Sequence, residues 1–374
     1  MFLALREIAF ARGRFVLMGT VVTLIATLMV LLSGLSVGLV NDGVSGLQRI
    51  PVTSFAFQEQ VPKDSAFSRS VVSRSAVDTW AGQPGVEHAA PFGNTLVNAS
   101  TERGVEIDFA LFGIEVDSFL APGVAEGRPL GSGPDEVVIS STAAQEGIEV
   151  GDVITVEPTG TQLRVAGVME EQHTFGHVDV AYLELATWQE VRAGIRAGDP
   201  VPDRVYDEIT AVAVYGDDVN LPAGDAQAET TSMTREESFG ASPGYTAETA
   251  TLQLIQAFLY AISALVVGSF FTVLTIQRQR EIAVIRALGA STGYLLRDSL
   301  VQSLALLLVS AGLGMGIGLA AGAALSATPM PFALEAGPIA IATTALLVLG
   351  LVGAAVGVAR IVRVDPLAAL GDNR

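Results

Sequence analysis

The sequence predicts an α+β membrane protein with four transmembrane helices and a large mixed α/β extracellular domain between the first and second helices. Half of the 374 residues are hydrophobic and only 16% are charged, against roughly 25% in an average soluble domain. The net charge of -18 comes from one block, because residues 42–248 hold 33 acidic and 11 basic side chains. Outside that block lie four long stretches without a charge.

Each uncharged stretch is long enough to span a bilayer, which takes about 20 mostly apolar residues. We predict spans at residues 15–40, 249–277, 299–325 and 336–359. Buried helices of a soluble core are the alternative, but four such stretches exceed what one soluble core uses. The first stretch is also longer than the about 7–15 apolar residues of a signal peptide, so we expect an uncleaved anchor.

Arginine placement predicts the orientation, since cytoplasmic segments near spans are enriched in basic residues. All ten arginines outside the acidic block fall on the cytoplasmic side if the N-terminus does: Arg6, Arg12, Arg14, Arg278, Arg280, Arg286, Arg297, Arg360, Arg363 and Arg374. We therefore expect a multi-pass protein of the cytoplasmic membrane with both termini inside. The predicted cytoplasmic parts are an interfacial helix (1–14), a coupling segment (278–298) and a tail (360–374). The extracellular parts are residues 41–248 and the turn 326–335.

The acidic block has the pattern of a mixed α/β domain. Strands are expected at 137–140, in "VGDVITVEP" and "QLRVAGVM" around the turn "TGT", and in "VDVAYLEL" and "DEITAVAVYG". A short helix closed by glycine is expected at 141–147. His173 and His177 have a spacing that binds metals on a helix, but the glycine in "HTFGH" favours an ordinary loop.

Several classes of function are disfavoured. The chain has no cysteine, which excludes disulfides, iron–sulfur clusters and thiolate zinc sites. Its acidity argues against nucleic-acid binding. It lacks the G-x-x-x-x-G-K-[ST] phosphate loop, and its spans carry no ionisable residue of the kind that proton- or sodium-coupled carriers bury. A transporter of this sequence must take its energy from a separate motor.

Two segments resemble the ABC permeases of the FtsX-like and MacB-like superfamily. They are "RQREIAVIRALGASTGYLLRDSLVQSLALLLVSAGLGMGIG" from residue 278 and "RIVRVDPLAALGD" from residue 360. The order of one span, a large outer domain and three spans is similar too. Residues 242–290 and "EQHTFGHVDVAYL" are similar to the permeases of haem exporters within it.

The resemblance implies a MacB-type fold and a subunit that transports without being an enzyme. It implies a permease homodimer working with two copies of a separate ABC ATPase, which binds the ATP, and passing motion outward by mechanotransmission. Haem (heme) is the implied transported ligand, drawn from membrane lipid, and no cofactor is held permanently. The coupling residues that would dock into the ATPase are Glu281, Ala283, Val284, Ala287, Leu288, Gly289 and Ala290.

A haem site needs an apolar slot, a polar rim and in many proteins an axial ligand such as His, Met or Tyr. The outer halves of spans one and two offer these groups. Tyr245 also suits an interfacial anchor, and Met29 suits ordinary packing. The candidate haem-binding residues are Met29, Leu32, Leu35, Tyr245, Glu248, Gln253, Gln256, Phe258 and Tyr260, with Gly34 and Gly38 beside them.

Two alternatives share this architecture. One is a permease for another cargo, namely a lipoprotein, a lipid or an antimicrobial peptide. The other exports nothing and uses its outer domain to switch on a cell-wall hydrolase. The outer domain has no coiled-coil heptad run, which counts mildly against the second.

Overall fold

The computed structural model describes residues 12–133, 135–277, 291–328 and 330–362. The chain divides into two compact units. The outer domain is Val40–Glu248, and the helical unit combines Met1–Leu39 with Thr249–Arg374. The predicted coupling residues Glu281–Ala290 lie outside the described residues, as do residues 1–11 of the predicted interfacial helix and 363–374 of the tail.

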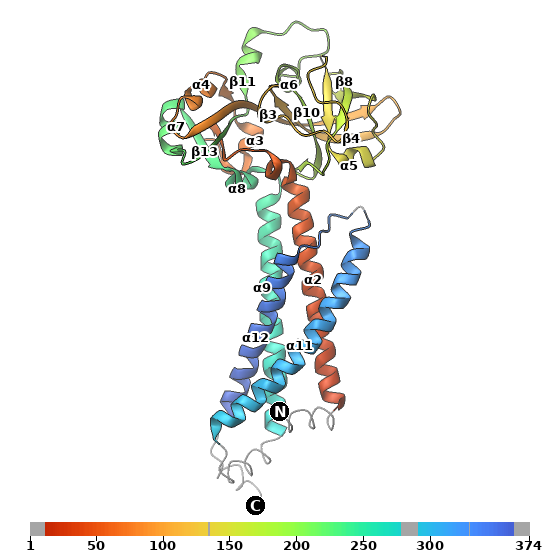
Figure 1. Ribbon diagram of the computed structural model, residues 1–374, viewed down its shortest axis with the longest axis vertical. Helices are drawn as coiled ribbons and strands as arrows, with labels where there is room; N and C mark the ends of the chain where they lie inside the picture. Colours follow the sequence, from red (N-terminus) through yellow and green to blue (C-terminus); the bar gives the residue numbers. More distant parts are fainter. Residues whose placement is uncertain (1–11, 134, 278–290, 329, 363–374) are drawn as a thin grey trace, which may run out of the picture. The chain divides into compact units, whose positions relative to one another are not determined.

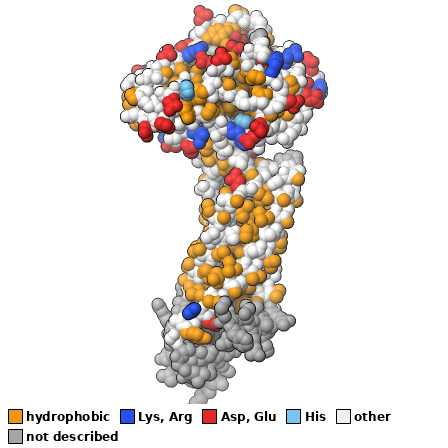
Figure 2. Space-filling view, viewed as in Figure 1, with side chains coloured by type: hydrophobic (Ala, Val, Ile, Leu, Met, Phe, Trp, Pro, Cys, Tyr) orange, Lys and Arg blue, Asp and Glu red, His pale blue; other side chains and the backbone are white. Residues whose placement is uncertain are grey.

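Four long apolar helices in the described residues confirm the predicted fold class. They are α2 (Arg12–Arg49), α9 (Tyr245–Gln277), α11 (Thr292–Leu325) and α12 (Ala336–Val362), and they run alongside one another (Figure 1). Leu17, Leu265 and Val309 are each at least 64% exposed. On the face in Figure 2, hydrophobic side chains cover the helical unit, whereas charged ones gather on the outer domain. The surface of the helices is therefore suited to lipid.

The helices begin and end at somewhat different residues from the predicted spans. Helix α2 continues through Arg49, and α9 begins at Tyr245, so both extend into the outer domain. Helix α11 begins at Thr292, within the predicted coupling segment, and the hydroxyl of Ser291 accepts a hydrogen bond from the Tyr294 N–H at its start. A serine at this position satisfies one of the free N–H groups of the first turn.

Small residues let α2 and α11 approach closely. A Cβ added to Gly314 would lie 2.4 Å from the Thr23 carbonyl oxygen. The hydroxyls of Thr23 and Thr27 donate to the carbonyls of Ser310 and Gly314 on α11, each over 3.1 Å. In a bilayer the hydrophobic effect does not drive helices together, so close packing and interhelical hydrogen bonds of this kind stabilise their association.

The turn between α11 and α12 packs onto α2. A Cβ at Gly34 would lie 2.3 Å from Cζ of Phe332, and one at Gly38 would lie 2.2 Å from the Pro331 carbonyl oxygen. The Ala333 N–H donates to the carbonyl of Gly34 over 3.1 Å. Gly34 and Gly38 are therefore packing sites for this turn.

The outer domain is built on a twisted sheet, whose strand order is β13-β1-β12-β3-β4-β10-β6-β8-β5, with β7 pairing β3 and β8, and β9 pairing β10. Most pairs are antiparallel, but β10 with β4 and β6 with β8 are parallel. The strands are β1 Ser54–Gln58, β3 Val86–Thr101, β4 Glu106–Ile114, β5 Glu126–Gly127, β6 Glu136–Ile139, β7 Val153–Glu157, β8 Thr161–Val168, β9 Thr174–Phe175, β10 Val178–Glu184, β12 Ala211–Gly216 and β13 Thr230–Thr234, while β2 Val72–Ser73 and β11 Glu208–Ile209 pair separately.

The predicted strands around the turn "TGT" and in "VDVAYLEL" are confirmed by β7, β8 and β10, and the predicted helix by α5. Strand β3 joins the two halves of the sheet, since its first half pairs with β12 and its second with β4. Short helices cover the sheet (Figure 1): α3 Ala66–Arg69, α4 Ala76–Ala81, α5 Ser141–Gln145, α6 Leu185–Arg192, α7 Leu221–Ala228 and α8 Arg235–Ser238, with 3-10 turns Lys63–Ser65, Asp203–Asp207 and Phe239–Ala241.

The core of the outer domain is aromatic. Phenylalanines from several strands meet edge to face, for example Phe92 and Phe112 with ring centroids 5.0 Å apart. The chain's two tryptophans, Trp80 and Trp188, are both fully buried here. The last turns of α2 are anchored in the same core through Leu47 and Ile50.

Candidate functional site

A cavity of about 280 Å³ lies among α2, α9 and α12 of the helical unit. Its walls are mainly apolar, with four polar side chains that can orient a ligand: Ser33, Ser36, Gln256 and Tyr260. The volume lies near the lower end of the about 300–1,000 Å³ found for small-molecule pockets. The apolar lining residues are Met29, Leu32, Val37, Leu259, Pro338, Ile341 and Ala342.

The cavity brings together four of the predicted haem-binding residues, Met29 and Leu32 from α2 with Gln256 and Tyr260 from α9. Gln256 and Tyr260 are four positions apart, which places them on one face of the helix. Gln253 lies one turn before Gln256 on the same side of α9 but is exposed and is not part of the lining. Phe258 lies on another face, and its side chain is 61% exposed. Leu35 is half-buried and is not part of the lining.

Sequence reasoning missed the part of the lining that α12 supplies, Pro338, Ile341 and Ala342, as well as the two serines of α2. When all faces of a span are apolar, the sequence does not show which of its residues line a cavity. The remaining two predicted residues, Tyr245 and Glu248, belong to the outer domain. Tyr245 packs against Phe239 with ring centroids 6.2 Å apart.

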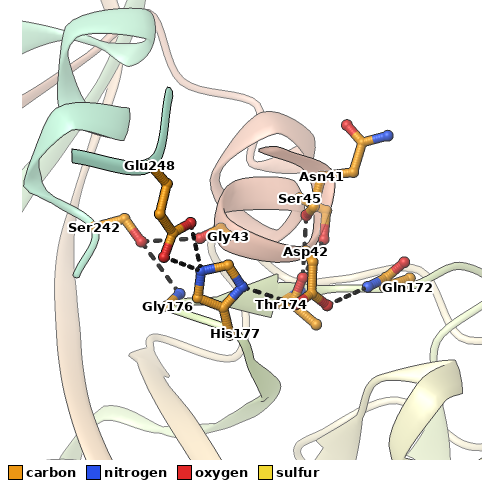
Figure 3. A network of polar contacts seen from close by, with 10 residues as sticks. All are labelled: Asn41, Asp42, Gly43, Ser45, Gln172, Thr174, Gly176, His177, Ser242 and Glu248. Carbon is orange, nitrogen blue, oxygen red and sulfur yellow. Dashed lines mark hydrogen bonds and ion pairs between the residues drawn. The ribbon is translucent and has the colours of Figure 1, made fainter. Parts of the chain in front are cut away.

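Glu248 takes part in a polar cluster within the outer domain (Figure 3). The imidazole of His177, in the turn between β9 and β10, lies between two carboxylates. Its Nδ1 is 2.8 Å from Asp42 Oδ2 on α2, and its Nε2 is 3.0 Å from Glu248 Oε2 on α9. One side chain thus joins the last turns of α2 to the first turn of α9.

Both carboxylates are satisfied at once only by an imidazolium, because neutral imidazole carries one N–H and has one acceptor nitrogen. Partial burial lowers the pKa of His177, but the hydrogen bond to Asp42 and the charges of Glu248 and Asp42 outweigh it. The net result is a pKa above the ordinary value of 6.5. The geometry and the electrostatics therefore both favour the charged form.

Backbone and hydroxyl groups hold this cluster in place. The Gly176 N–H donates to the Gly43 carbonyl over 2.9 Å, and the Ser242 hydroxyl donates to the same carbonyl over 2.9 Å. The Thr174 N–H donates to the Ser45 hydroxyl over 3.0 Å. His177 itself has a φ of 65°, a left-handed conformation uncommon for residues other than glycine. The turn is thus fixed to α2 independently of the imidazole.

The two histidines of "HTFGH" have different surroundings. His173 lies next to the short strand β9, its Nδ1 is 3.0 Å from the Glu171 carbonyl oxygen, and burial lowers its pKa. Within the described ranges, no group of three or more His, Cys, Asp or Glu side chains is arranged to hold a metal ion. Strand β9 and Gly176 separate the two histidines, so this segment is not a helix.

Two family profiles match the chain over most of its length. The profile described as the MacB-like periplasmic core domain matches residues 17–231, and the FtsX-like permease C-terminal profile matches residues 254–366. The first covers more than half of the chain.

Curated relatives align with most or all of the chain. A Staphylococcus epidermidis protein, provisionally named hemin transport system permease protein HrtB, is 23% identical over 100% of this chain and 99% of its own length. An uncharacterized ABC transporter permease of Mycobacterium tuberculosis is 27% identical over 78% of this chain and 76% of its own. The periplasmic region of MacB from Actinobacillus actinomycetemcomitans superimposes with a TM-score of 0.36 and 16% identity, over 51% of this chain and 92% of that one.

Proposed function

The chain belongs to the MacB-like and FtsX-like ABC transporter permeases, and from this premise we propose that it is the membrane subunit of a pump that exports haem. A permease of this family works with a partner ATPase subunit and is not itself an enzyme. Its four spans would form the membrane part of the transporter, and its MacB-like domain would form the extracytoplasmic part.

The cavity among α2, α9 and α12 carries the proposal. Its apolar walls suit the flat macrocycle of haem, and it combines a thioether (Met29) with a phenol (Tyr260), two of the side-chain types that ligate haem iron in proteins. At about 280 Å³ it would enclose only part of a haem. The rest of the ligand would contact lipid or a second permease copy. The names of the staphylococcal relatives point to the same cargo.

The orientation of the pump follows from the charge distribution. We place the acidic outer domain outside the cell and both termini in the cytoplasm, since arginines flank the spans on that side. Two permease copies and two ATPase copies would form the working complex. ATP binding would close the motors, and residues 281–290 would pass the movement to the spans.

Haem-stimulated ATP hydrolysis tests the proposal. The permease, purified with its ATPase in lipid nanodiscs, should show saturable stimulation by haem. Met29→Ala and Tyr260→Phe should raise the half-maximal haem concentration about tenfold each, the effect of losing about 1.4 kcal/mol of binding. Phe258→Ala is the matched control on α9, because its side chain points away from the cavity, and it should leave the haem dependence unchanged.

Other outcomes assign other functions. Stimulation by a lipoprotein, a lipid or an antimicrobial peptide with none by haem would replace the cargo and keep the pump. Recovery of a cell-wall hydrolase on the outer domain, with no stimulation by any of these, would indicate a mechanotransmitter. Unchanged sensitivity to haem in cells that lack the gene would also contradict haem export.

A further inference from the structure

The chain enters the outer domain through α2 and leaves it through α9, and Asp42 and Glu248 mark these two points. The domain spans Val40–Glu248, so both carboxylates lie within a few residues of its limits. Glu248 is on the first turn of α9, and Asp42 is two turns before the end of α2. A bond between them ties the only two segments through which the domain is connected to the rest of the chain.

We propose that protonated His177 is a positioning residue, an ionic clamp that holds the ends of α2 and α9 together and opens when the imidazole loses its proton. The imidazolium donates one N–H to Asp42 and the other to Glu248. Neutral imidazole keeps one N–H, so it can serve only one carboxylate, and its bare nitrogen then faces the other. The clamp needs no cargo and does not depend on which substrate the permease carries.

The surrounding charges support this assignment. Asp42 on α2 and Glu248 on α9 contact His177. Other titratable and charged groups on the surrounding elements include Arg49 on α2, Tyr245 on α9, and Glu171, His173 and Asp179 on the β9–β10 hairpin and the segment before it. Arg49 is engaged by Glu171, 2.5 Å away. His173 has a lowered pKa and is the less easily charged of the two histidines. Within the described part of the chain, the imidazolium is thus the cation in contact with the two carboxylates.

The direction of the pH effect follows from the raised pKa of His177. Below 6.5 the imidazole is charged and the clamp is closed. As the pH rises through the pKa of the folded protein, the bond to one carboxylate is lost. Hydrogen bonds from the Gly176 N–H to Gly43 and from the Thr174 N–H to Ser45 keep the turn on α2, so the bond to Glu248 on α9 is the one expected to break.

Pulsed electron paramagnetic resonance on the full-length permease in nanodiscs tests the clamp. The chain has no cysteine, so spin labels at Gln48→Cys and Ala247→Cys, in labelled chains diluted with unlabelled ones, report the distance between α2 and α9 within one chain. We expect a narrow distance distribution at acidic pH that broadens as the pH rises. In His177→Gln the distribution should be broad at every pH, while His173→Gln, in the same segment, should behave as the unaltered chain does.

The Glu248→Gln variant distinguishes a clamp that depends on the proton of His177 from packing that does not. The introduced amide can donate to the bare nitrogen of neutral imidazole, so this variant should keep the narrow distribution at alkaline pH and lose the pH dependence. Fluorescence of Trp80 and Trp188 identifies variants with a folded outer domain. A distribution that stays equally narrow across the pH range in the unaltered chain overturns the proposal, as does a pH response that persists unchanged in folded His177→Gln.

Discussion

The Thr27 hydroxyl on α2 donates a hydrogen bond to the carbonyl of Gly314 on α11, 3.1 Å away. Its single hydrogen is shared with the Thr23 carbonyl of its own helix, 2.9 Å away. Only a glycine permits this approach, since a Cβ at position 314 would lie 2.6 Å from the Cβ of Ala26. The contact is therefore a property of both helices together.

Gly314→Ala should destabilise the helical unit, because the added methyl group forces α2 and α11 apart. Gly316→Ala is the matched control, two residues along α11, where an added Cβ meets nothing within 4 Å. In the control, the better helix former should give no loss, and a gain of up to about 0.5–1 kcal/mol. Unfolding by SDS in mixed micelles, followed by helical circular dichroism, measures the difference. Equal stabilities of the two variants would contradict the packing described.

Gly34 and Phe332 should show energetic coupling. Gly34→Ala clashes with the ring, and Phe332→Leu leaves a void beside Gly34 and Gly322. Each single change should be destabilising, but the double variant should lose less than the two effects combined, with a coupling of about 0.5–3 kcal/mol. The same SDS unfolding measures the cycle, with Met330→Ala, an exposed residue of the same turn, as the neutral reference. Strict additivity would show that the turn does not pack on α2.

Asp179→Asn should stabilise the outer domain at neutral pH. The side chain is only 7% exposed, and burial raises its pKa above 3.8 although Thr142 and Ser140 donate hydrogen bonds that lower it. A raised carboxyl pKa means that the folded state binds the proton more tightly, so ionisation costs stability once the pH exceeds the pKa. The gain should shrink as the pH falls through this raised pKa toward 3.8.

Urea unfolding followed by tryptophan fluorescence measures this effect in the outer domain alone, because Trp80 and Trp188 are the only tryptophans of the chain. Asp108→Asn, an exposed carboxylate on β4, is the control and should change little. A variant at position 179 that is less stable than the native chain at neutral pH would show that the hydrogen bonds outweigh burial.

The spans were predictable because a run of uncharged residues has one stable environment, the bilayer. The ends of the helices were less predictable. Helix α2 continues through Asn41 and Asp42 to Arg49, since its buried residue Leu47 joins the core of the outer domain. The MacB-type fold of the outer domain was predicted from the family resemblance, with which the order of domain and spans agrees.

The candidate cavity was predictable only in part. The helical period places Gln256 and Tyr260 on one side of α9 and Phe258 on another, but it does not show which neighbouring helix either side meets. Contributions from α12 depend on packing between helices far apart in the chain. The cluster around His177 depends on contacts over still longer separations, because Asp42 lies 135 residues before it and Glu248 lies 71 residues after it. Local sequence patterns do not predict contacts between residues so far apart in the chain.

Labelling from one side of the membrane tests most directly the claim on which the whole account depends, that the acidic domain lies outside the cell and the basic ends inside. Single cysteines at Ser68 in the outer domain and at Tyr294 near the start of α11 are both exposed. A membrane-impermeant maleimide added to sealed cells should react with Ser68→Cys at once and with Tyr294→Cys only after permeabilisation. Reaction of Tyr294→Cys in sealed cells, with Ser68→Cys protected, would reverse the orientation and contradict the assignment of a cytoplasmic ATPase partner.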